Sequence, residues 1–265
     1  MSDASTLAAL WPSETYARTA AGRATAVILG PVAPEWQGAG FCRPLLGTLT
    51  DAGYDVHVVD SIAPLLSQVR PSPDAMLGTY RDLILDTTPA PDLIAGYAIG
   101  GTLAMALASN LPSVTRVLSL SGPGFADDLL AHELLRLLAR LSQDDLTGSL
   151  RLLAASVAPR GTQPNADHMD QVEHADPNLA IARMTLGFRL LLGLDARAAL
   201  CRFQGRTLAL TGALSQLATA ANLGGAPDQT GQFQHIEIEE AGMRILFDNP
   251  AACIEIIKNW LHENE

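Results

Sequence analysis

The sequence predicts an α/β fold, in which a mostly parallel central sheet is flanked by helices and carries an inserted helical cap. Short apolar runs rich in β-branched residues alternate with longer runs of helical periodicity, which is typical of a parallel sheet covered by helices. Over residues 125–203 this alternation stops, and only helical patterns occur. The chain has 265 residues, 48% of them hydrophobic, which is enough for one large α/β domain or two small ones.

The expected strands are short, apolar and spread over the whole chain. They cover residues 25–29 (TAVIL), 56–59 (VHVV), 93–97 (LIAGY), 117–121 (VLSLS), 207–211 (TLALT) and 236–238 (IEI). Residues 14–19 (ETYART) precede them as a candidate edge strand. Because helical segments separate successive buried strands, we expect parallel neighbours joined by right-handed crossovers.

The expected helices of the core lie between these strands and after the last one. They cover residues 41–52, 74–87, 99–110 and 251–262. The last of them places Ile254, Ile257, Trp260 and Leu261 at helical spacing. Such a spacing gives the helix one apolar face that can pack against the sheet.

The segment 125–203 is expected to form the cap. A leucine-rich helix over residues 129–141 begins it, and further helices are expected near residues 146–155 and 181–192. The polar stretch 161–178 should be a loop. We therefore divide the chain into a core of residues 1–124 and 204–265 and a cap of residues 125–203. The cap would cover the carboxyl ends of the strands, where ligands bind in open α/β sheets.

Composition excludes several classes of partner. The net charge of −11 opposes binding to nucleic acid or to an anionic membrane. No stretch approaches the roughly 20 apolar residues of a membrane span, and residues 1–14 lack the pattern of a signal peptide. Cys42, Cys201 and Cys253 are scattered without metal-ligand spacing, which indicates thiols of a reducing compartment. We expect a cytoplasmic protein without a metal or a cofactor.

The most informative segment is DLIAGYAIGGTLAMALA, where a predicted strand runs through Gly96-Tyr97-Ala98-Ile99-Gly100 directly into a helix. A turn this tight needs residues without a side chain on both sides of its apex, and the apex residue tends to have a strained, positive φ. The segment resembles the nucleophile elbow, G-x-S-x-G, of the α/β-hydrolase superfamily, with Ala98 in the position of the serine.

Two further segments follow in the order of that superfamily. After the strand TLALTG, Ser215 occupies the position of the catalytic acid, and after HIEIEEAG, Met243 occupies that of the histidine. The resemblance covers roughly residues 20–125 and 200–265. Alanine has no nucleophilic atom, methionine cannot carry a proton, and serine cannot stabilise an imidazolium. The resemblance therefore implies a hydrolase scaffold that does not act through a serine triad.

The resemblance also implies a retained oxyanion cradle. The N–H of Ile99 lies at the start of the helix after the elbow, where the helix dipole favours negative charge. The loop 30–36 stands where relatives place a second donor. Since its two prolines have no N–H, Val32 or Ala33 would supply that donor, with Trp36 close by. A carbonyl or acyl oxygen is the expected ligand atom.

Four side chains are candidates for further roles, and each has a structural alternative. Tyr97 is either part of the chemistry or a packed aromatic residue. Glu35 is either a general base or a solvated carboxylate. Asp127 is either a displaced acid or the N-cap of the next helix. Arg244 either attracts an anionic ligand or pairs with an acid such as Asp248.

Three functional hypotheses follow. The first, which the retained strained elbow favours slightly, is a non-hydrolytic enzyme (a lyase, dehydratase, cyclase or isomerase) acting on a small carbonyl or acyl compound. The second is an inactive pseudo-hydrolase that binds a ligand, a second copy of itself or another protein through its cap. The third, the weakest, is an esterase or thioesterase whose triad is inactivated or lies elsewhere. Fold alone does not choose among them.

Overall fold

The computed structural model describes residues 11–16, 24–67, 72–162, 175–224 and 232–263. Within these ranges, seven strands form one sheet in the order β1-β3-β2-β4-β5-β6-β7. All neighbouring strands are parallel except β1 and β3. The strands are β1 (Ser13–Tyr16), β2 (Ala24–Leu29), β3 (Tyr54–Val59), β4 (Leu93–Tyr97), β5 (Arg116–Leu120), β6 (Arg206–Gly212) and β7 (Phe233–Ile238). The predicted fold class is confirmed.

The strand boundaries differ from the expected ones at a few places. β7 begins at Phe233 rather than at residue 236, because it pairs with β6 along its whole length although its side chains are only partly buried. β5 ends at Leu120, since Ser121 has a φ of +50° and leaves the strand. The edge strand β1 ends at Tyr16, and residues 17–19 of the expected strand lie outside the described residues.

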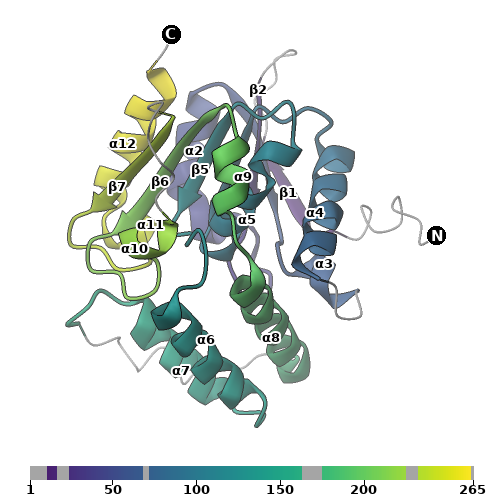
Figure 1. Cartoon of the computed structure of the whole chain (residues 1–265), viewed down its shortest axis with the longest axis vertical. Helices are drawn as coiled ribbons and strands as arrows, with labels where there is room; N and C mark the ends of the chain where they lie inside the picture. Colours follow the sequence, from purple (N-terminus) through teal and green to yellow (C-terminus); the bar gives the residue numbers. More distant parts are fainter. Residues whose placement is uncertain (1–10, 17–23, 68–71, 163–174, 225–231, 264–265) are drawn as a thin grey trace.

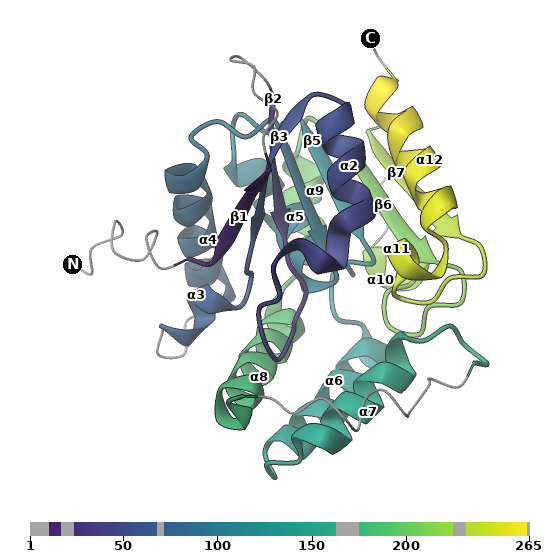
Figure 2. The same ribbon diagram turned by 180° about the vertical axis from the view of Figure 1, so that it is seen from behind.

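Helices cover both faces of the sheet. On one face lie α4 (Pro73–Thr87), α5 (Ile99–Leu107) and α9 (Arg197–Arg202), as Figure 1 shows. On the other lie α2 (Arg43–Asp51) and α12 (Pro250–His262), which come to the front in Figure 2. Each face has its own cluster of buried apolar residues, so the sheet is the middle layer of a three-layer core.

Several helices of the core are shorter than expected, and others were not expected. The expected helix 41–52 begins as the 3-10 helix η1 (Gly38–Cys42), and the helix 99–110 ends as η2 (Ala108–Asn110). The short helices α3 (Ala63–Leu66), α10 (Ala220–Leu223) and α11 (Ile245–Asp248) have too few residues to show a period in the sequence.

Three helices form a cap below the sheet: α6 (Asp128–Leu141), α7 (Leu146–Val157) and α8 (Pro177–Gly193) (Figures 1 and 2). α6 packs against both α7 and α8 and buries Leu130, Leu134, Leu137 and Leu141, whereas Leu129 and Leu135 stay exposed. The polar stretch expected as a loop is only partly described: residues 163–174 lie outside the described ranges, and residues 177 and 178 already belong to α8. Residues 197–202, inside the segment assigned to the cap, form α9 and pack against α5.

In the described part of the chain, no helix has both the length and the apolar character needed to cross a bilayer.

Candidate functional site

The turn between β4 and α5 has the strained geometry of an elbow. Ala98, at its apex, has φ +53° and ψ −120°, a conformation that costs a residue with a side chain about 1–3 kcal/mol. Backbone hydrogen bonds hold it there: its N–H donates to the carbonyl of Leu120 at 2.9 Å, and its carbonyl accepts the N–H of Gly101 at 2.9 Å. The strand before it and the helix after it therefore fix the apex.

Two glycines allow the chain to make this turn. A Cβ on Gly96 would overlap the carbonyl oxygen of Gly100, and a Cβ on Gly100 would overlap that of Leu29 in β2. Both neighbours are backbone atoms, which cannot rotate away. The first turn of α5 lies against β2 and β4 only because these side chains are absent.

Replacing Ala98 with glycine should stabilise the protein. Glycine adopts a positive φ without a steric penalty, so about 1–3 kcal/mol of strain is released against an entropic cost of up to about 1 kcal/mol. We expect the free energy of unfolding in urea to rise by about 1 kcal/mol. Ala139→Gly, on the exposed side of α6, is the control and should lower it by a similar amount. A loss of stability in Ala98→Gly would contradict the strain.

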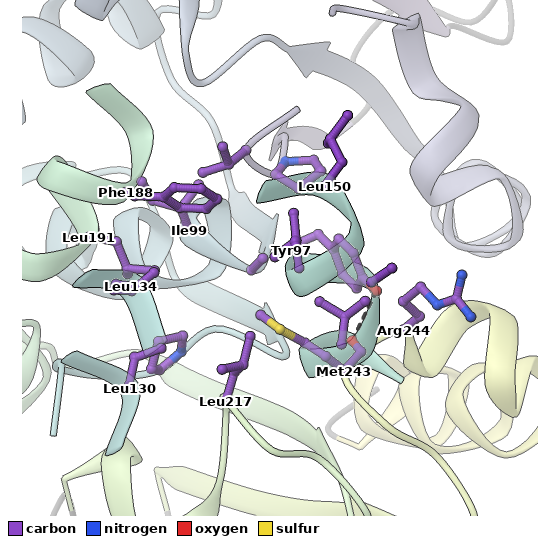
Figure 3. A pocket seen from close by; sticks show the side chains of 17 residues that line it. Tyr97, Ile99, Leu130, Leu134, Leu150, Phe188, Leu191, Leu217, Met243 and Arg244 are labelled. Carbon is purple, nitrogen blue, oxygen red and sulfur yellow. Dashed lines mark hydrogen bonds between the residues drawn. The ribbon is translucent and has the colours of Figure 1, made fainter. Parts of the chain in front are cut away.

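A cavity of about 400 Å³ lies directly over this elbow, between the strand ends and the cap. Figure 3 shows its lining, in which leucine side chains of the cap face the elbow and Met243. The core contributes Pro31, Val32, Tyr97, Ala98, Ile99, Pro123, Leu217, Met243 and Arg244, and the cap contributes Leu130, Leu134, Leu150, Leu153, Ala154, Val157, Phe188 and Leu191.

The three positions that the sequence comparison assigned to a triad, Ala98, Ser215 and Met243, separate in the structure. Ala98 and Met243 both line the cavity. Ser215 does not: its side chain is 2% exposed, and its hydroxyl oxygen accepts the N–H of Ala218 at 3.2 Å. The hydroxyl is thus used to shape the loop after β6.

Met243 connects the cap to the elbow through its backbone. Its N–H donates to the carbonyl of Val157, the last residue of α7, at 2.9 Å. Its carbonyl accepts the hydroxyl of Tyr97 at 2.9 Å. Burial raises the pKa of Tyr97 far above its usual value, and Asp248 raises it further, so this hydroxyl keeps its proton. Tyr97 is therefore a packed aromatic residue whose polar atom is already in use.

Two of the three candidate donors of the oxyanion cradle, Ile99 and Val32, belong to residues that line the same cavity. No acceptor among the described residues receives the N–H of Ile99 or of Val32, so both remain available. Ala33 and Trp36 do not line the cavity. The carbonyl of Ala33 accepts Nε of Arg183 at 3.1 Å, and the ring of Trp36 packs near Phe41.

The two candidate carboxylates lie outside the cavity. Oε1 of Glu35 accepts the N–H of Ala175 at 3.3 Å. Asp127 is the N-cap of α6, where Oδ1 accepts the N–H of Leu130 at 2.9 Å. The carboxylate of Asp127 thus has the structural role that the sequence offered as its alternative.

Sequence reasoning missed one pair that positions the site. Arg183 of α8 and Asp60, which directly follows β3, form a two-pronged ion pair with N···O distances of 2.8 and 2.9 Å. Both are buried, at 5% and 1% exposed. Nε of Arg183 also donates a hydrogen bond to the carbonyl of Ala33, in the loop after β2. α8 contains two arginines within a mostly apolar run, Arg183 and Arg189, and an arginine in such a run was the signal that could have indicated this pair.

The chemistry available in the cavity is limited. Among the residues that the structure describes, the lining has no Ser, Thr, Cys, His, Asp or Glu, and Arg244 is the one charged residue among them. Nowhere in the described ranges do three His, Cys, Asp or Glu side chains gather in a way that would hold a metal ion. The cavity therefore provides shape, apolar surface and backbone donors.

Comparison with solved structures identifies the fold. MGS-M2, an alpha/beta hydrolase enzyme from a Medee basin deep-sea metagenome library, matches with a TM-score of 0.77 at 9% identity, over 96% of this chain and 95% of its own. The enol-lactonase from Burkholderia xenovorans LB400 matches with a TM-score of 0.70 at 12% identity, over 95% and 96% of the two chains. The chain has the α/β-hydrolase fold.

A third relative by structure is the 2-hydroxy-6-oxo-6-phenylhexa-2,4-dienoate hydrolase from Rhodococcus sp. strain RHA1, with a TM-score of 0.69 at 16% identity, over 89% of this chain and 90% of its own. No family model matches the chain, and no curated protein matches its sequence. At these identities, the likeness establishes the α/β-hydrolase fold and leaves the function to the site.

Proposed function

We propose that this chain binds a small, mainly apolar carbonyl or acyl compound without forming a covalent bond to it, in the cavity over Ala98. The observation that carries the proposal is the lining of that cavity. It retains the elbow and the N–H groups of Ile99 and Val32, which have no acceptor among the described residues, and its described side chains include no nucleophile and no base.

The size and surface of the cavity support a ligand. A volume of about 400 Å³ lies within the range of roughly 300–1,000 Å³ that is usual for small-molecule pockets. Apolar side chains form most of its wall, and burying apolar ligand surface contributes about 25 cal/mol per Å². The two N–H groups would orient a carbonyl oxygen within this wall.

The same lining weakens the enzyme hypothesis that the sequence favoured. A lyase or isomerase needs a group that moves a proton, and the two candidate carboxylates, Glu35 and Asp127, are engaged outside the cavity. A non-hydrolytic enzyme stays the second candidate because Ala98 keeps its strained conformation. Such an enzyme would depend on orientation and on the oxyanion donors alone.

The experiment tests covalent chemistry and binding separately. The purified protein is incubated with a fluorophosphonate and with 4-nitrophenyl octanoate, and intact mass and absorbance are recorded. We expect no adduct and no hydrolysis above buffer, because no side chain in the lining can attack. The neutral ketone 2-decanone is then titrated by calorimetry, and saturable binding is expected to raise the melting temperature.

A matched pair of variants locates the ligand. Leu150→Trp places a large side chain in the cavity and should abolish ketone binding, whereas Leu135→Trp, on the exposed surface of α6, should leave it unchanged. A covalent adduct, or catalytic turnover by the unmodified protein, would overturn the proposal in favour of an enzyme. Equal binding to both variants would place the ligand elsewhere.

A further inference from the structure

The geometry points to an apolar monocarboxylate as the ligand, with its chain in the cavity and its carboxylate beside Arg244 at the rim. The inference rests on the proposed binding function and names the class of compound that the same cavity selects. Two properties of Arg244 carry it: its position in the lining and the absence of a partner for its charge.

Arg244 marks the mouth of the cavity. It is the one exposed residue in the lining, whereas its neighbours Met243 and Tyr97 are each 7% exposed. In Figure 3 its guanidinium group projects away from the apolar side chains that surround the cavity. A charged ligand group at this place stays in contact with water, so it avoids the desolvation that a charge inside the apolar wall would suffer.

The charge of Arg244 has no partner in the described part of the chain. The expected pairing with Asp248 is wrong: the two side chains form no ion pair, and Oδ2 of Asp248 accepts the N–H of Gly242 at 2.9 Å. No other hydrogen bond or ion pair of the Arg244 side chain occurs among the described residues. Its guanidinium group is therefore available to a ligand.

A carboxylate is the group that fits this arrangement. A guanidinium group binds a carboxylate through two parallel hydrogen bonds, and one arginine balances one negative charge. The net charge of the chain is −11, which opposes the approach of an anion, so binding of a carboxylate would depend on the local charge of Arg244. The isolated cation beside an apolar cavity thus favours an amphiphile with a single negative end over a neutral compound of the same length.

The test compares decanoate with the neutral 2-decanone by calorimetry at low salt. We expect the unmodified protein to bind decanoate more tightly than the ketone. Arg244→Gln should lower the affinity for decanoate about threefold to fivefold and leave the affinity for the ketone unchanged. Raising the salt concentration should lower the affinity of the unmodified protein for decanoate and have little effect on the affinity of Arg244→Gln. Arg189→Gln, which removes an exposed arginine of α8 that does not line the cavity, should change neither affinity.

The outcomes separate this inference from the function on which it rests. If both compounds bind equally and Arg244→Gln changes neither, the inference is overturned and the binding function stands. If neither compound binds the unmodified protein, the proposed function itself fails. If Arg189→Gln lowers the affinity for decanoate as much as Arg244→Gln does, the net charge of the protein governs the affinity and not a site at the rim. This result would also overturn the inference.

Discussion

Gly96→Ala should destabilise the protein by at least about 3 kcal/mol, the largest loss that we expect from adding one carbon atom. The new Cβ would overlap the carbonyl oxygen of Gly100, which belongs to the first turn of α5. Relief would require α5 to move away from β4, together with the buried side chains that α5 packs against the sheet. The free energy of unfolding in urea measures the loss, and lower yields of folded protein would accompany it.

Gly78→Ala is the control for this variant. Gly78 lies inside α4, and a Cβ added there would meet no atom within 4 Å. Because alanine has the higher helix propensity, we expect this change to stabilise the protein by up to about 1 kcal/mol. The same substitution should thus have opposite signs at the two sites. A change of stability at Gly96 no larger in size than the one at Gly78 would show that α5 can shift and that the elbow is not rigid.

Arg183→Met should lower the free energy of unfolding by about 3–5 kcal/mol. The substitution leaves the carboxylate of Asp60, 1% exposed, without the guanidinium group that compensates its charge. It also removes the donor to the carbonyl of Ala33, so the loop that carries Val32 loses this hydrogen bond to α8. We expect ketone binding in the cavity to weaken together with stability.

The double variant Arg183→Met with Asp60→Leu separates the ion pair from the packing around it. Removing both charges leaves no uncompensated ion, so we expect the double variant to recover most of the stability that the single variant loses. Asp60 also accepts the N–H of Ile62 at 2.9 Å, so full recovery is not expected. Losses that simply add in the double variant would mean that the two side chains contribute independently.

The elbow shows why some parts of this protein could be predicted from the sequence. The turn depends on residues that lie next to one another in the chain: β4, the glycines around Ala98 and the first turn of α5. Their spacing therefore predicts both the local conformation and the loss of the nucleophile. The ends of β5 and β7 were predicted less well, because Ser121 leaves β5 through its positive φ and pairing with β6 extends β7 back to Phe233.

The candidate carboxylates show where such reasoning stops. Glu35 and Asp127 have the chemistry of a general base, and their positions in the sequence are compatible with one. Asp127 instead accepts the N–H of Leu130, three residues further on, and Glu35 accepts the N–H of Ala175, 140 residues away in the sequence. The direction in which each carboxylate points decides its role, and the sequence does not specify that direction.

By itself the sequence determined the mostly parallel sheet, the inserted helical segment and an elbow at Ala98 without a serine, because periodicity and turn chemistry act between residues close in the chain. The tertiary structure alone decided that Met243 faces the cavity, that Arg183 of α8 reaches Asp60 after β3, and that Arg244, at the rim, has no partner among the described residues. Each of these depends on contacts between segments far apart in the chain, which packing fixes only when the whole domain has formed.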